Sequence, residues 1–171
     1  MFIGAQDERR FGRISIPKSC WCAKPERPQL AKKQRRQTVY AYTAVCPKLA
    51  KTTSLILPYA NTDMFNIFLE QLGKDFKAYK LIIQVDQAGW HKSRVLKIPN
   101  NIALIEQPSR SPELNPVEHI WEEVRETFLN NKIHHSIEEL IDQLAFGLNT
   151  IANYGEKLTS MTMFNHLNVA I

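Results

Sequence analysis

A chain of 171 residues, 44% of them hydrophobic and 23% charged, is long enough for one domain with a substantial apolar core. It contains no apolar run near the roughly 18 residues of a membrane-spanning helix and no signal peptide, which argues against a membrane or secreted protein. Its three cysteines are an odd number without a secretory signal, so we expect reduced thiols and a cytoplasmic location.

The first half of the chain is expected to be mainly strands. Two short strands, over 2–7 and 11–16, are predicted to flank a charged turn. The β-branched and aromatic residues of 38–45 and the run at 52–57 predict two adjacent antiparallel strands. An Asn N-cap and apolar residues at helical spacing then predict a helix over 61–76.

The second half is expected to alternate between strand and helix. Apolar runs predict strands over 81–86 and 102–106, separated by a short helix at 93–97. Apolar stripes at helical spacing predict two longer helices, over 115–130 and 136–153. Antiparallel strands followed by alternating strand and helix indicate a single α/β domain with a mixed sheet flanked by helices.

Three carboxylates stand at the ends of separate predicted elements. Asp86 closes the apolar strand LIIQV, and Asp7 lies in the N-terminal run QDERRFG. Glu118 lies near the start of a helix, in the run SPELNPVEHIW of residues 111–121. Carboxylates with almost no Cys or His partners suit magnesium, which prefers oxygen ligands and is often held together with substrate phosphates. This pattern predicts phosphodiester chemistry.

Each of these acids also has a purely structural explanation. Asp86 would serve equally to cap the turn after its strand, because Asp readily hydrogen-bonds to nearby backbone. Glu118 falls at the third helical position after an N-cap at Asn115, where the carboxylate of a capping box stands. Asp7 and Glu8 point to opposite faces of a strand, so only one can meet Asp86, and the residue pattern does not choose between them.

Positive charge is concentrated at the N-terminal end. Residues 1–60 hold 12 Lys or Arg and 3 Asp or Glu, a balance of +9, whereas residues 111–171 hold 3 and 9, a balance of −6. A solvated loop would explain such a run, but beside a metal-type acid set we favour a surface that tracks DNA phosphates. The candidate DNA-binding residues are Lys24, Arg27, Lys32, Lys33, Arg35 and Arg36, together with His91 and Lys92 after the central strand.

Three ordered motifs resemble the DDE domain of bacterial insertion-sequence transposases in the mariner superfamily. They are DERRFG from Asp7, DQAGWHKS from Asp86 and SPELNPVEHIW from Ser111. The resemblance covers nearly all of 1–171 and implies a ribonuclease H-like fold and a magnesium-dependent DNA transposase. It assigns the catalytic, metal-binding acids to Asp7, Asp86 and Glu118, with two magnesium ions for which manganese can substitute. By analogy, it selects Asp7 over its neighbour.

Two departures from the family pattern flank the expected site. Relatives have two prolines and a Tyr before the SPELNP run, whereas Pro108, Ser109 and Arg110 stand here, and Gln87 replaces a common Asn or Gly. Two alternatives therefore stay open: a catalytically inactive DNA-binding remnant, and another ribonuclease H-like nuclease that cuts DNA without joining it.

The expected partners also come from the resemblance. Relatives carry an N-terminal helix-turn-helix region that binds the element ends, and Asp7 lies too near Met1 to leave room for one. We therefore expect a catalytic domain whose helix-turn-helix half is encoded separately. Its substrates are expected to be the element ends and target DNA, on which it would act as a homodimer.

Overall fold

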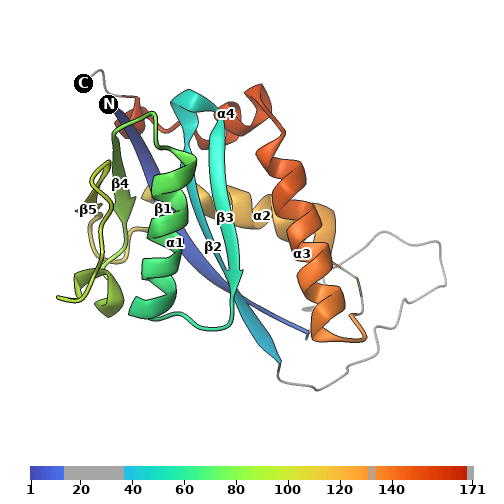
Figure 1. The fold of residues 1–171 in the computed structure, drawn as a ribbon. Coiled ribbons are helices and arrows are strands. Elements are labelled where there is room, and N and C mark those ends of the chain that lie inside the picture. Colours follow the sequence, from blue (N-terminus) through green and yellow to red (C-terminus); the bar gives the residue numbers. More distant parts are fainter. Residues whose placement is uncertain (14–36, 131, 133, 169–171) are drawn as a thin grey trace.

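The computed structural model describes residues 1–13, 37–130, 132 and 134–168. In this part of the chain one mixed sheet has the strand order β3-β2-β1-β4-β5 (Figure 1). Its strands are β1 (Phe2–Gly12), β2 (Thr38–Cys46), β3 (Lys51–Leu57), β4 (Leu81–Val85) and β5 (Ile102–Glu106). β2 is antiparallel to both β1 and β3, whereas β4 and β5 run parallel to β1. The predicted mixed sheet is confirmed.

Helices cover both faces of the sheet and bury two separate apolar layers (Figure 1). The helix α1 (Thr62–Asp75) packs its phenylalanines and leucines against β2 and β4 on one face. On the opposite face α2 (Val117–Glu123) packs against β1 and β2, α3 (Ile137–Ala152) packs against β3, and α4 (Glu156–Thr162) packs against α2. Alternate residues of the central strands serve the two layers, because successive side chains of a strand point to opposite faces.

The N-terminal strand departs from the prediction. A charged turn between strands at 2–7 and 11–16 is wrong, because β1 continues unbroken to Gly12. Glu8 and Arg9 stand opposite residues of β2 in the ladder, and their charges are matched by partners on either side of the sheet. A charged pair within a strand thus does not mark a turn when tertiary contacts compensate both charges.

The segment after β4 also differs. The predicted helix over 93–97 is wrong, because the helical turn comes earlier, as the 3-10 helix η2 (Gly89–Lys92). Asn66 of α1 holds the later segment in a loop: its side-chain oxygen accepts from the Lys97 amide at 2.8 Å. The predicted helix over 115–130 is present as α2 followed by a π-helical segment, η4 (Val124–Leu129).

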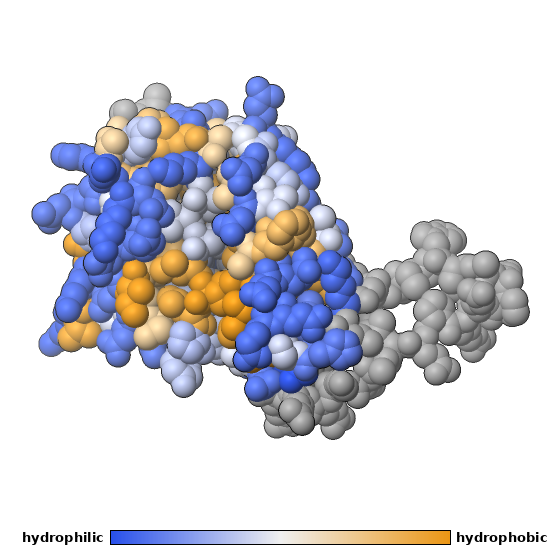
Figure 2. Space-filling model, turned by 45° about the vertical axis from the view of Figure 1, so that its right-hand side comes forward, coloured by the Kyte–Doolittle hydropathy of each residue, from blue (hydrophilic) through white to orange (hydrophobic). Residues whose placement is uncertain are grey.

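The surface is mixed in polarity. Figure 2 shows a face on which hydrophobic residues form a band between hydrophilic margins. Large apolar side chains exposed in the described residues include Tyr59, Ile67 and Phe146. Within the described ranges, no helix has the length and apolar character needed to cross a membrane.

Candidate active site

The pleat of β1 separates the two adjacent acids that the sequence could not distinguish. Asp7 lies on the same face as Ala5 and Phe11, which belong to the core beneath α2. There the Trp121 indole N–H donates to Asp7 Oδ2 at 2.8 Å. Glu8 points to the opposite face, toward the α1 side of the sheet.

Asp86 follows β4 directly, at the carboxyl end of a strand that runs parallel to β1. Its Oδ1 accepts from the backbone N–H of Ala88 at 2.9 Å and lies 2.8 Å from His91 Nδ1. The hydrogen bond from His91, the largest effect, outweighs partial burial and lowers the pKa of the Asp86 carboxyl. The expected turn contact therefore exists, but it occupies only one of the two carboxylate oxygens.

The start of α2 is tied to β1 by the buried side chain of Asn115. This amide donates to the Gln6 carbonyl at 3.1 Å and accepts from the Val117 N–H at 3.1 Å. Glu118, in the first turn, forms an ion pair with Arg9 at 2.7 Å. The Asn115 backbone N–H donates to the Pro112 carbonyl and is thus not engaged in a capping box. Glu118 is directed toward the sheet.

The three acids meet in one pocket of about 380 Å³ at the carboxyl ends of β4 and β5. Ligand sites of open α/β sheets lie at this edge. The lining residues are Asp7, Asp86, Gln87, Ala88, Gln107, Pro108, Ser109, Arg110, Ser111, Pro112, Asn115 and Glu118. Both sequence departures from the family pattern therefore lie in the wall of this pocket. A larger groove, of about 990 Å³, lies beside α1 but is lined by none of these acids.

The electrostatics of the pocket favour a cation. The pKa of Asp7 is raised from 3.8 to about 7, mainly by burial and in smaller part by the charges of Glu8, Glu118 and Asp86. The Trp121 hydrogen bond opposes this rise but does not cancel it. Such a carboxyl gains most from a positive charge placed among the three acids.

His91 does not occupy the position expected of a DNA-binding residue. Its side chain is only 1% exposed and lies beneath Asp86, on the α1 side, so a DNA contact does not fit this position. Burial lowers its pKa, but its hydrogen bond to Asp86 and the nearby negative charge of Glu8 outweigh that effect and raise it to about 9. Lys92 is half-exposed and pairs with Glu106 of β5 at 2.9 Å.

Four other residues contribute to the site in roles that the sequence did not predict. Arg9, Trp121 and Asn115 contact or position the acids, and Glu8 holds His91. Strand alternation groups Arg9 with Asp7, but it does not identify Glu118 as a partner 109 residues away. The six basic residues Lys24, Arg27, Lys32, Lys33, Arg35 and Arg36 lie outside the described residues.

The sheet order is that of a ribonuclease H-like domain, and the three acids lie in a pocket at one edge of its sheet. Residues 3–141 match the family model described as DDE superfamily endonuclease. The chain therefore belongs to this endonuclease family, and its fold is that of the catalytic domain of mariner-type transposases.

The chain is also similar to a protein of known sequence and to solved structures. The uncharacterized protein y4pE/y4sA of Sinorhizobium fredii is 37% identical over 124 residues, 71% of this chain and 91% of that protein. The Mos1 strand transfer complex aligns with a TM-score of 0.61 and 14% identity over 95% of this chain and 55% of the Mos1 chain. The mariner Mos1 paired end complex with Mg aligns with a TM-score of 0.67 and 11% identity, over 93% of this chain and 51% of the Mos1 chain. The chain thus spans about half the length of the Mos1 chains.

Proposed function

We propose that this chain is the catalytic domain of a DNA transposase that cuts the ends of a mobile element and joins them to target DNA. The observation that carries the proposal is the convergence of Asp7, Asp86 and Glu118, from three distant segments, on one pocket. Membership of the DDE endonuclease family supports the same chemistry. In this reading the three carboxylates are the catalytic, metal-binding residues.

The donor set fits a hard divalent cation such as Mg²⁺ or Mn²⁺. Each acid has one oxygen held by the protein: Oδ2 of Asp7, Oδ1 of Asp86 and Oε2 of Glu118. Within the described residues, the second oxygen of each acid has no hydrogen-bond partner. Oriented carboxylates that each keep a free oxygen suit Mg²⁺ coordination, and the bound cation would favour the ionised form of Asp7.

The metal ion would supply the chemistry, and residues of the chain would hold its carboxylate ligands in place. Bound Mg²⁺ would lower the pKa of the attacking hydroxyl group and stabilise the leaving oxygen. Trp121 keeps Asp7 in place, and the Ala88 N–H keeps Asp86 in place. The first nucleophile would be water at the element end, and the second the freed 3′-hydroxyl, attacking target DNA at a TA dinucleotide. No side chain needs to act as a covalent nucleophile.

Recognition of the DNA ends would come from outside the acid pocket. The basic run between Lys24 and Arg36 would contact phosphates, so affinity for DNA should fall steeply with salt. An affinity for DNA that stays the same between about 50 and about 200 mM salt would contradict this role. A separately encoded helix-turn-helix partner and a homodimer on DNA complete the proposal.

Plasmid cleavage tests the catalytic assignment. Wild-type protein with Mg²⁺ or Mn²⁺ should nick supercoiled DNA, and Asp86→Asn should abolish nicking while binding DNA as before. Asp142→Asn, which changes an exposed acid of α3, is the matched control and should nick normally. Metal-dependent nicking retained in Asp86→Asn would refute the assignment. Metal binding without any nicking by the wild type would support an inactive remnant instead.

Joining of DNA strands separates a transposase from a simple nuclease. A duplex with a free 3′-hydroxyl at an element end should become covalently linked to a target plasmid, and the product migrates as a larger species on a denaturing gel. Nicking without any linked product would contradict strand transfer and favour a ribonuclease H-like nuclease.

A further inference from the structure

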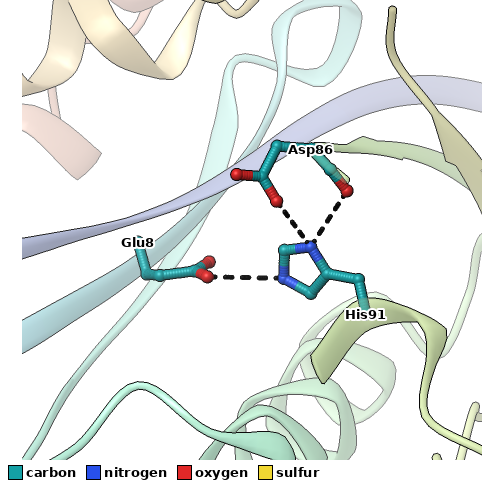
Figure 3. A group of neighbouring side chains, drawn as sticks. All are labelled: Glu8, Asp86 and His91. Carbon is teal, nitrogen blue, oxygen red and sulfur yellow. Dashed lines mark hydrogen bonds and ion pairs between the residues drawn. The ribbon is translucent and has the colours of Figure 1, made fainter. Parts of the chain in front are cut away.

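The imidazole of His91 bridges Asp86 and Glu8, two acids that come from neighbouring strands (Figure 3). Its Nδ1 lies 2.8 Å from Asp86 Oδ1 and 3.1 Å from the Asp86 carbonyl oxygen. Its Nε2 lies 3.5 Å from Glu8 Oε1, an ion-pair distance rather than a hydrogen bond. The ring therefore presents one nitrogen to each carboxylate.

Other side chains contact His91 and Glu8. The His91 ring packs on Phe65 of α1, with the ring centroids 4.4 Å apart. Glu8 accepts from the Trp90 indole N–H at 2.5 Å and from the Gln6 side-chain amide at 2.8 Å. With these contacts Glu8 is committed to the protein interior, where its side chain is 6% exposed.

A metal centre made of Glu8, Asp86 and His91 does not fit this geometry, although their ligand atoms lie within 4.8 Å of one another. A single ion requires lone pairs directed at one point. Here the two carboxylates face opposite nitrogens of the ring, and Nδ1 is directed at the Asp86 carboxylate itself (Figure 3). The arrangement is instead that of a histidine hydrogen-bonded to Asp86 on one side and facing the charge of Glu8 on the other.

We propose that His91, oriented by Glu8, is a positioning residue that aims Asp86 into the pocket. Together with the Ala88 N–H it engages Asp86 Oδ1, which leaves Oδ2 as the oxygen available to a metal ion. The inference rests on the proposed function, because it assigns Asp86 as a metal ligand. Loss of such a supporting hydrogen bond weakens metal affinity by about 10- to 100-fold in comparable sites.

Three substitutions of His91 separate hydrogen bonding from packing. His91→Asn places an amide N–H near the position of Nδ1 and keeps the donor to Asp86. His91→Gln places its amide near the position of Nε2, and His91→Leu supplies no donor. Metal affinity is measured on DNA-free protein from the electron paramagnetic resonance signal of free Mn²⁺, and the melting temperature of each variant is recorded.

The expected result is a loss of about 10- to 100-fold in Mn²⁺ affinity for His91→Leu and His91→Gln, with His91→Asn within about threefold of wild type. The order should follow the position of the donor and not the melting temperature. Equal losses in all three variants would reveal a packing role and overturn the inference, as would no loss in any of them.

Glu8→Gln gives a second measurement. The glutamine oxygen still accepts from Trp90, but the negative charge facing Nε2 is gone. Because the hydrogen bond from His91 to Asp86 survives, we expect a smaller loss of Mn²⁺ affinity. The loss should be about threefold, compared with about 10- to 100-fold for His91→Leu. A loss as large as that of His91→Leu would contradict an indirect role for Glu8 and make it a direct ligand.

Two controls separate this inference from the proposed function. Asp86→Asn should lose Mn²⁺ affinity more than any His91 variant, and Asp142→Asn should retain it. If Asp86→Asn bound Mn²⁺ like the wild type, the proposed metal site would fail. If Asp86→Asn lost binding while the His91 series did not change, only the positioning role would fail.

Discussion

Replacing Asp7 with Asn is expected to stabilise the metal-free protein at neutral and alkaline pH. The carboxyl is enclosed between β1 and α2 and shares its pocket with Asp86 and Glu118. Burial is the main reason why its pKa rises from 3.8 to about 7. Asparagine keeps an oxygen that can accept from Trp121, but it carries no charge that must be removed from water.

The magnitude follows from the pKa. A tenfold change in an equilibrium constant corresponds to about 1.4 kcal/mol, so a rise from 3.8 to about 7 costs up to roughly 4 kcal/mol of folding free energy once Asp7 is ionised. The folded state holds this proton more tightly than the unfolded chain does. The cost is therefore absent below about pH 4, grows as the pH rises to 7, and is constant above that.

Urea unfolding followed by circular dichroism, in a metal chelator at pH 4, 6 and 8, would measure this effect. The gain of Asp7→Asn over the wild type should be near zero at the lowest pH and greatest at the highest. Asp86→Asn is the matched control with the opposite sign, because His91 lowers the pKa of Asp86 and its ionised form favours folding. The reasoning would be refuted if Asp7→Asn were no more stable than the wild type at pH 8. It would also be refuted if the gain in stability at pH 4 were as large as the gain at pH 8.

Two further substitutions act on the same pocket. Trp121→Phe removes the donor that lowers the pKa of Asp7, so Mn²⁺ affinity at pH 7 should fall and largely recover at pH 8.5; a loss independent of pH would point to disturbed packing instead. Arg9→Gln breaks a partly exposed ion pair with Glu118 and should change the free energy of unfolding by less than about 1 kcal/mol. The same change should raise Mn²⁺ affinity, because it removes a positive charge beside the proposed metal site; a fall would show that Arg9 orients Glu118 for the metal.

The sequence predicted the elements that carry strong local patterns. The apolar run before Asp86, the Asn cap of α1 and the stripe of α2 appear as predicted, because each depends on neighbours within a few residues. The three acids were candidates from their positions at element ends, whereas the ribonuclease H-like class and the choice of Asp7 over Glu8 came from motif resemblance. Periodicity alone left Asp7 and Glu8 equivalent until the faces of β1 were assigned.

The contacts that the sequence could not predict join distant segments. Arg9 and Glu118 are 109 residues apart, and Trp90 and Glu8 are 82 apart. Charges within β1 suggested a turn because their partners lie in other parts of the chain. The side chain of Asn66 likewise determined the path of the loop after η2, and its sequence neighbours gave no sign of that role.

The alternation of β1 has a consequence for how this domain can evolve. Asp7 faces the pocket, and Glu8 faces His91, which contacts Asp86. One strand therefore supplies both a pocket acid and the acid that faces His91. Inserting or deleting one residue ahead of them, with the pairing to β2 retained, would exchange their faces. Variation in length should therefore accumulate in the loops that join the strands, whereas β1 admits substitutions but not single-residue insertions or deletions.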